Sequence, residues 1–229
     1  GLLPTPSKSH YTFNLRDFSR VVQGVLLQEP SDQFQNKPSV MRLWTHEALR
    51  VFGDRLTDDT DRQWMCDHCS AMCKEVFKCD FQSEFDHIRP ADETETGYGT
   101  LRRLFWGDYM TPADEDERPY AEVPDLQQLQ ERTEEALSDF NSASKKPMEL
   151  VMFMFAIEHV SRIARVLRMP GGNALLVGVG GSGRQSLSIL ATEMAGYQLF
   201  RIEITKSYGM TEWREDLKTV LIEAGAGDR

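Results

Sequence analysis

The feature that constrains this chain most is a glycine-rich segment that follows an apolar run and precedes a helix-forming stretch. Ala174–Gly178 is aliphatic, and Gly178 and Gly183 have the spacing of the phosphate loop G-x-x-x-x-G-K-[ST]. Glycines let the backbone approach a phosphate closely, and the N-terminus of the next helix directs N–H groups and a partial positive charge toward it. The segment predicts a strand, a loop and a helix that open a nucleotide-binding α/β module.

The candidate phosphate-binding residues belong to this loop and the first helical turn. They are Gly178, Val179, Gly180, Gly181, Ser182, Gly183, Arg184, Gln185 and Ser186. Arg184 replaces the usual lysine and keeps a positive charge, although its planar fork differs from an ammonium. Gln185 replaces the Ser or Thr that holds Mg²⁺, and Ser186 is one position out of register. We expect ATP or ADP binding with an impaired Mg²⁺ site and assign no catalytic residue and no metal ligand. A glycine-rich turn without a ligand is the alternative.

The residues around the loop predict alternating strands and helices. An apolar helix is expected over Met148–Arg168 and a helix over Arg184–Ala195, with a second strand at Leu199–Ile204. A last helix is expected over Thr211–Ala224, with Trp213, Leu217, Val220 and Leu221 facing inward. This order is typical of a parallel sheet. The most apolar run, Leu150–Ile157, is too short to cross a bilayer and is expected to be a buried helix.

The residues before this module read as helices joined by polar loops. Four helices are expected, at 14–28, 38–53, 57–78 and 124–141, the first with Asn14 as its N-cap. Residues 80–120 are weakly patterned, with loops expected at Ala91–Thr100 and Thr111–Arg118 and with Leu104–Tyr109 as a short apolar anchor between them. The polar joint Asn141–Pro147 predicts a boundary between a helical domain, 1–141, and an α/β domain, 142–229.

The charge of the chain is unevenly divided between these two parts. The formal net charge is −10; residues 1–141 hold 27 Asp and Glu against 15 Lys and Arg, whereas residues 142–229 hold 9 against 11. Wrapping nucleic acid requires a basic face. We therefore expect no nucleic-acid partner and interpret the acidic excess as a solvated surface.

Four cysteines lie close together and raise the question of a zinc site. They are Cys66, Cys69, Cys73 and Cys79, with His68 and His87 nearby. The first three follow the i, i+3, i+7 spacing of one helix stripe. Structural zinc sites usually draw paired ligands from turns, and no second C-x₂-C pair is present. Buried core thiols are the favoured interpretation, and zinc is the alternative.

Several long motifs resemble one family of proteins, the axonemal dynein heavy chains. The loop sequence GVGGSGRQSL resembles the start of the fourth AAA+ module of these ring motors. The resemblance includes Arg184 and Gln185, which stand where the general phosphate-loop pattern has Lys and Ser or Thr. The resemblance extends over nearly the whole chain and is carried by Gly178–Leu187, Ile202–Leu217, Leu2–Asp17, Trp44–Leu56 and Lys145–Phe153. It is weakest over residues 80–120.

The resemblance implies a fold and a set of partners. Residues 1–141 would be the helical lid of the third module, and 142–229 the first βα units of the parallel sheet of the fourth. Arg16 falls where such lids carry a sensor-2 arginine, and an ordinary solvent-facing arginine is the alternative. The parent would be an ATP-driven, minus-end-directed microtubule motor of the cytoplasm and the ciliary axoneme. Its partners would be the rest of the ring, intermediate and light chains and microtubules, without a membrane.

The resemblance also bears on catalysis. In this family the Walker B strand, whose acids hold Mg²⁺ and polarise water, is expected just after Asp228-Arg229. Phosphoryl transfer depends on several such parts at once, so we do not expect this segment to hydrolyse ATP alone. Two other functions remain: a regulatory ring segment with a vestigial nucleotide site, and an unrelated P-loop enzyme such as a small kinase. We further expect the lid and the βα core to move as one block.

Overall fold

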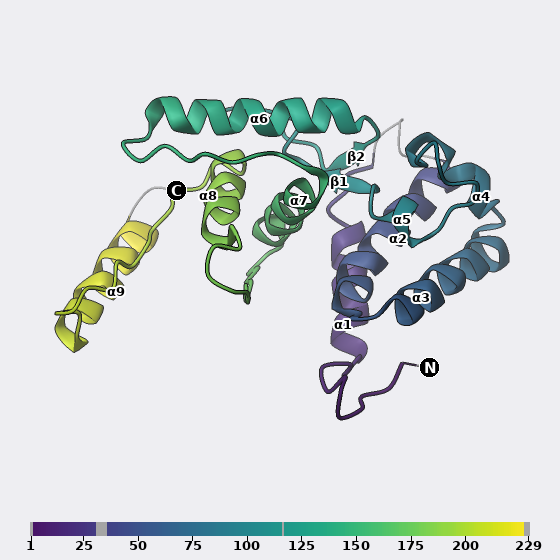
Figure 1. Ribbon diagram of the computed structural model, residues 1–229, viewed down its shortest axis with the longest axis horizontal. Coiled ribbons are helices and arrows are strands. Elements are labelled where there is room, and N and C mark those ends of the chain that lie inside the picture. The colour runs from purple at the N-terminus through teal and green to yellow at the C-terminus, as the bar shows by residue number, and fades with distance from the viewer. Residues whose placement is uncertain (1, 31–35, 116, 227–229) are drawn as a thin grey trace. The chain divides into compact units, whose positions relative to one another are not determined.

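The computed structural model describes residues 2–30, 36–115 and 117–226 of the chain. It divides into two units, 1–196 and 197–229. The first unit holds the helices α1 to α8 and one small hairpin, and the second holds α9 (Figure 1). The predicted joint Asn141–Pro147 lies inside the first unit, so the two predicted domains pack together up to Gly196.

Three helices open the first unit, as the sequence predicts. They are α1 (Leu15–Val25), α2 (Lys37–Val51) and α3 (Asp59–Met72), and a 3₁₀ turn, η2 (Gly53–Arg55), follows α2. Each helix begins at a polar N-cap, namely Asn14, Asn36 and Asp58. These side chains accept hydrogen bonds from free N–H groups of the first turn, so each helix start is fixed locally.

Helix α1 leaves several of its large apolar side chains exposed. Leu15, Phe18 and Leu26 are exposed, whereas Val21 and Gly24 are buried. Gly24 lies against the carboxylate of Glu47 on α2, so close that an added Cβ would overlap it. The close approach of α1 to α2 through a glycine explains which face is covered.

Helix α3 carries the cysteine stripe into the core of the first helices. Cys66, Cys69 and Cys73 are buried, and burial raises the pKa of Cys66 to about 11 and those of Cys69 and Cys73 to about 12. A wider turn, η3 (Cys73–Phe77), continues the helix to Lys78, which has φ of +57°. Within the part of the chain that the structure describes, no group of three His, Cys, Asp or Glu residues could hold a metal ion.

The weakly patterned segment 80–120 and the residues after it contain short elements. They are α4 (Phe81–Glu84), the 3₁₀ turn η4 (Asp86–Ile88), α5 (Tyr98–Leu101) and the antiparallel strands β1 (Phe105–Gly107) and β2 (Ala121–Val123). The apolar anchor Leu104–Tyr109 is confirmed, since most of it is buried and it supplies β1. The hairpin was missed because its strands are three residues long and joined by a polar loop.

Three helices complete the first unit around a second core. They are α6 (Leu126–Ala143), α7 (Met154–Arg168) and α8 (Arg184–Met194). In Figure 1, α6 lies across α8, and α8 packs beside α7. Leu129 and Leu137 of α6 are buried and Leu126 is partly buried, as predicted. The hairpin β1–β2 contacts both α7 and α2, so it joins the two cores.

The predicted buried helix over Leu150–Ile157 forms only in part. Asn141 donates from Nδ2 to the carbonyl of Met148 (2.9 Å) and accepts from its N–H (2.7 Å), which holds the chain extended there. Alternate side chains then point apart, so Met152 is buried while Val151 and Phe153 are exposed. Helix α7 therefore begins at Met154 instead of Met148.

The two predicted parallel strands do not form among the described residues. Ala174–Gly178 and Leu199–Ile204 are without regular structure, and Leu175 is 91% exposed. They belong to different units, 1–196 and 197–229. A strand requires ladder hydrogen bonds to a neighbour, and β-propensity alone does not supply them.

The described residues of the second unit form one helix, α9 (Met210–Ala226), where the sequence predicts Thr211–Ala224. Glu212 accepts a hydrogen bond from the N–H of Gly209 (2.8 Å) at its start. Trp213, Leu217 and Leu221 were expected to face inward but are exposed, and Val220 is partly so. Among the described residues of this unit, 197–226, the irregular residues 197–209 accompany α9 and provide no second apolar element over that face. None of the described helices is long and apolar enough to cross a membrane.

Candidate functional site

The glycine loop has the backbone geometry of a phosphate cradle. Gly181 and Gly183 have φ of +78° and +76°, which side-chain-bearing residues rarely adopt. A Cβ at Gly180 or Gly181 would meet no atom within 4 Å, so there is open space beside both glycines. Gly183 starts α8 with no side chain capping its first turn. The free N–H groups and helix dipole at this end favour an anion.

Arg184 supplies positive charge beside the loop. Its guanidinium donates from Nη1 to the carbonyl of Leu176 (3.3 Å) and from Nη2 to that of Val179 (3.2 Å). Gln185 is exposed and Ser186 is half-buried. The uncapped helix and the arginine fit a phosphate chain, whereas no hydroxyl stands at the position where Mg²⁺ is usually held.

The helix behind the loop is firmly anchored although the loop itself is exposed. Leu187, Leu190 and Met194 of α8 are buried against α7 and α6. Arg118 donates from Nη1 to the carbonyl of Ala195 (3.0 Å) and from Nη2 to that of Met194 (2.8 Å). A cation at the C-terminus of a helix is favourable, so Arg118 fixes the end of α8 opposite to the loop.

Arg16 lies in the first turn of α1 with an exposed side chain. It lines a cavity of about 400 Å³ with Arg20, Arg50 and Arg55. Among the described residues, nothing brings Arg16 into contact with the glycine loop. The structure therefore places the two predicted nucleotide features at separate sites.

A buried carboxylate, Glu47 of α2, connects α2 to α7. Arg165 of α7 donates from Nε to Glu47 Oε2 (2.9 Å), and its Nη2 also pairs with that oxygen. The hydroxyl of Tyr120 donates to Glu47 Oε1 (2.7 Å), and Nδ1 of His46 lies 3.0 Å from the same atom. Glu47 is fully buried, yet both its oxygens are satisfied.

These contacts set the protonation of the buried group. Burial alone raises the pKa of Glu47, but the hydrogen bonds from His46 and Arg165 outweigh it and bring the pKa to about 2. Burial lowers the pKa of His46, so its ring is neutral at pH 7. The buried connection between α2 and α7, called the joint from here on, therefore holds a permanent Glu47–Arg165 ion pair.

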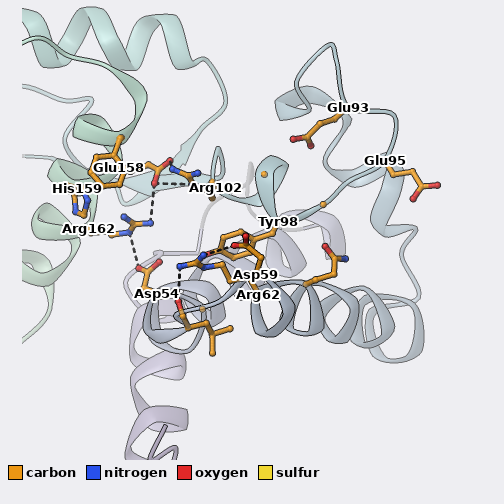
Figure 2. A pocket seen from close by; sticks show the side chains of 16 residues that line it. Asp54, Asp59, Arg62, Glu93, Glu95, Tyr98, Arg102, Glu158, His159 and Arg162 are labelled. Atoms are coloured by element: carbon orange, nitrogen blue, oxygen red, sulfur yellow. Dashed lines mark hydrogen bonds and ion pairs between the residues drawn. The ribbon is translucent and has the colours of Figure 1, made fainter. Parts of the chain in front are cut away.

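A second ionic chain runs along the wall of a cleft of about 840 Å³ between η2, α5 and α7 (Figure 2). Arg162 lies between two carboxylates, with Nε 3.1 Å from Asp54 Oδ2 and Nη2 3.3 Å from Glu158 Oε2. Glu158, which is buried, also pairs with Nη2 of Arg102 (2.8 Å). The spacing of residues 158, 162 and 165 on one face of α7 was the signal that could have revealed this joint.

Comparison with known proteins matches each part of the chain to a family model. Residues 148–229 match the family model described as the P-loop containing dynein motor region D4, and residues 1–88 match the AAA+ lid domain. The chain is 52% identical over 222 residues to human dynein axonemal heavy chain 12, 49% over 229 residues to human dynein axonemal heavy chain 3, and 43% over 224 residues to human dynein axonemal heavy chain 1. These alignments cover 96–100% of the chain but only 5–7% of the length of the relatives.

Proposed function

Because this chain belongs to the axonemal dynein heavy chains, we propose that it is a segment of an ATP-driven, minus-end-directed microtubule motor of the cilium. The relatives are named as axonemal dynein heavy chains, and the D4 model covers the glycine loop. On this proposal, 1–141 is the lid of the third AAA+ module and 142–229 begins the fourth. The rest of the ring, intermediate and light chains and microtubules are partners of the whole protein, located at the axoneme of the cytoskeleton.

The chemical part of the proposal is nucleotide binding at the loop Gly178–Ser186. The observation that carries it is the pair of positive-φ glycines leading into the uncapped start of α8. Backbone N–H groups of the loop and the helix would hold the phosphates of ATP or ADP, and Arg184 would replace the usual lysine. When bound, Mg²⁺ would neutralise phosphate charge. The loop fits Mg²⁺ poorly, because Gln185 offers no hydroxyl to hold the ion.

Equilibrium binding of fluorescent ATP and ADP to the 229-residue chain, with and without Mg²⁺, tests this part. Arg184→Ala should weaken binding about tenfold or more, because a charge-assisted hydrogen bond to phosphate contributes about 1.5–3 kcal/mol. Arg214→Ala, which removes an exposed arginine from α9, is the matched control. We expect Mg²⁺ to change the affinity little. Equal affinity in the two variants would contradict a phosphate role for Arg184.

A vestigial, regulatory nucleotide site is the second candidate function. One observation favours it: Arg184 donates to the carbonyl of Val179 in the loop and to that of Leu176 just before the loop, and it must leave both before it can reach a phosphate. No binding of ATP or ADP at millimolar concentration would support the vestigial site over the nucleotide-binding one.

The mechanical part of the proposal is that the segment acts as a joint between modules. Its support is the pair of ionic connections from α7, Arg165 to Glu47 and Arg162 to Asp54. Arg16 is the proposed sensor for the nucleotide of the third module. Spin labels at Gln63 on α3 and Glu193 on α8, in the full heavy chain, would measure the joint. We expect one narrow distance distribution in every nucleotide state, and a distance that changed with nucleotide would contradict a rigid joint.

A further inference from the structure

The end of η3 brings two of the four cysteines together. Lys78 has φ of +57°, a left-handed conformation that reverses the chain where the helical turns end. The carbonyl of Cys73 then accepts from the N–H of Lys78 and also from that of Cys79, the latter over 3.2 Å. This pair of hydrogen bonds ties Cys79 back to the first residue of η3.

The same hydrogen bond places the two cysteines within reach of a disulfide. The Cα–C, C=O and N–Cα bonds add to its 3.2 Å, so the Cα atoms of Cys73 and Cys79 lie at most about 7 Å apart. A disulfide joins Cα atoms that are roughly 4.4–6.8 Å apart. Cys79 also packs against the core cluster that contains Cys73, and its Sγ donates to the carbonyl of Phe77 in η3 (3.6 Å). Both thiols therefore belong to one packed turn.

The cysteines of this cluster differ in their access to solvent. Cys66, Cys69 and Cys73 are buried, whereas Cys79 is partly exposed. Burial raises the pKa of Cys73 to about 12, so Cys73 is a protonated thiol at pH 7. A dissolved oxidant therefore meets Cys79 before the other three thiols, because the reaction requires an accessible sulfur. Cys73 lies next to it as a second, protected thiol.

We infer that Cys79 and Cys73 form an oxidative modification site, at which hydrogen peroxide converts the two thiols into a reversible disulfide. The two cysteines have different parts in this reaction. Cys79, the accessible thiol, reacts with the peroxide, and Cys73, the buried thiol, resolves the product. The inference goes beyond the proposed nucleotide binding and does not depend on it.

The reaction has two steps. In the first, the sulfur of Cys79 attacks one peroxide oxygen: the S–O bond forms, the O–O bond breaks, and the leaving hydroxide takes the thiol proton as water. In the second, the sulfur of Cys73 attacks that of Cys79: the S–S bond forms, the S–O bond breaks, and the leaving hydroxide takes the Cys73 proton as water. Two thiols are oxidised, and one peroxide is reduced to two waters.

The disulfide closes a ring over residues 73–79 and restrains the turn that ends η3. Phe77 of this turn contacts Trp44 of α2, with 5.6 Å between the ring centres. Local opening of such a turn exposes its backbone N–H groups to exchange with solvent. Oxidation should therefore slow amide hydrogen exchange at Lys78 and Cys79, whose N–H groups donate to the carbonyl of Cys73.

The test is peptide mapping of the folded 229-residue chain after treatment with hydrogen peroxide and alkylation of the remaining thiols. Trypsin cuts after Lys74 and Lys78, so the disulfide joins peptide 63–74 to peptide 79–102. We expect this linked pair in the oxidised chain, with a mass lower by two hydrogen atoms than that of the two peptides together. Dithiothreitol should separate the pair again.

Single variants identify which thiol of peptide 63–74 is linked. Cys69→Ala is the matched control, because Cys69 is also buried and lies in the same tryptic peptide as Cys73. The linked pair should persist in Cys69→Ala and disappear in Cys73→Ala. Cys79→Ala, at a partly exposed site, should also abolish the pair and provides a second variant that disturbs the core less.

Three results would overturn the inference. The first is the absence of the linked pair from the folded, oxidised chain. The second is oxidation of Cys79 to sulfinic acid without any link, which would mean that Cys73 is out of reach. The third is linkage of Cys79 to Cys66 or Cys69 as often as to Cys73, as expected for a chain oxidised in urea. Amide exchange at Lys78 that oxidation left unchanged would contradict the restraint of the turn.

Discussion

The buried joint around Glu47 and the glycine loop at Gly178–Ser186 are both polar, but they are stabilised in opposite ways. In the joint, Glu47 is fully buried and receives hydrogen bonds from Tyr120 and Arg165. In the loop, residues 171–182 are exposed, and the main contacts are those of Arg184 with nearby carbonyls. The joint depends on tertiary packing, whereas the loop depends on backbone conformation and leaves its donors open to a ligand.

Replacing Glu47 with alanine should have the largest effect on stability. It leaves Arg165 as an uncompensated buried charge and removes the acceptor of Tyr120, so we expect a loss of about 3–5 kcal/mol in the free energy of unfolding. Denaturant titration followed by circular dichroism would measure it. The control Glu134→Ala removes an exposed glutamate that only accepts from Gln130 (2.8 Å), and a comparable loss there would contradict the importance of burial.

Lowering the pH should weaken the joint around Glu47. The folded pKa of Glu47, about 2, lies below its ordinary value of 4.5, so its contribution is complete above pH 4.5 and is lost as the pH falls through about 2. This contribution is on the order of 3 kcal/mol. His46, whose pKa is lowered by burial, acts in the same direction below about pH 6.5. Unfolding titrations from pH 7 to pH 3 should show falling stability, with a shallower slope in Glu47→Gln.

Adding a methyl group where α1 meets α2 should disturb the joint sterically. In Gly24→Ala the new Cβ would overlap the carboxylate of Glu47, so we expect a loss of about 1–3 kcal/mol. Gly225→Ala in α9 is the matched control, since its Cβ meets nothing within 4 Å and alanine favours a helix by about 1 kcal/mol. Thermal unfolding that showed the same sign for both variants would contradict this contact.

Substitutions in the exposed segment before the glycine loop should have the smallest effect on the free energy of unfolding. Leu175→Ala should alter the free energy of unfolding by less than about 0.5 kcal/mol, because Leu175 is 91% exposed. Leu190→Ala removes the same atoms from a fully buried site on α8 and should cost about 2–5 kcal/mol. A loss above 1 kcal/mol in Leu175→Ala would mean that the segment before the loop is packed in solution.

The starts of α1 and α8 were predictable because they depend on nearby residues, whereas α7 begins six residues later than predicted. Asn14 and the first residues of α8 lie where the sequence indicates, since a cap needs only the next few residues along the chain. The hairpin β1–β2 was not predictable, because each strand depends on a partner that is distant in the sequence. The predicted strand at Ala174–Gly178 shows the reverse case: a strong local preference that finds no partner among the described residues.

The sequence by itself determined the family, the glycine loop and most helices, because these follow from residue order and local spacing. Only the tertiary structure decided which charges meet: Arg165 with Glu47, Arg162 with Asp54, and the four arginines around one cavity. The physical reason is that burial and pairing depend on atoms from segments far apart in the chain. No local pattern marks Glu47 as a buried ion instead of a solvated glutamate on α2.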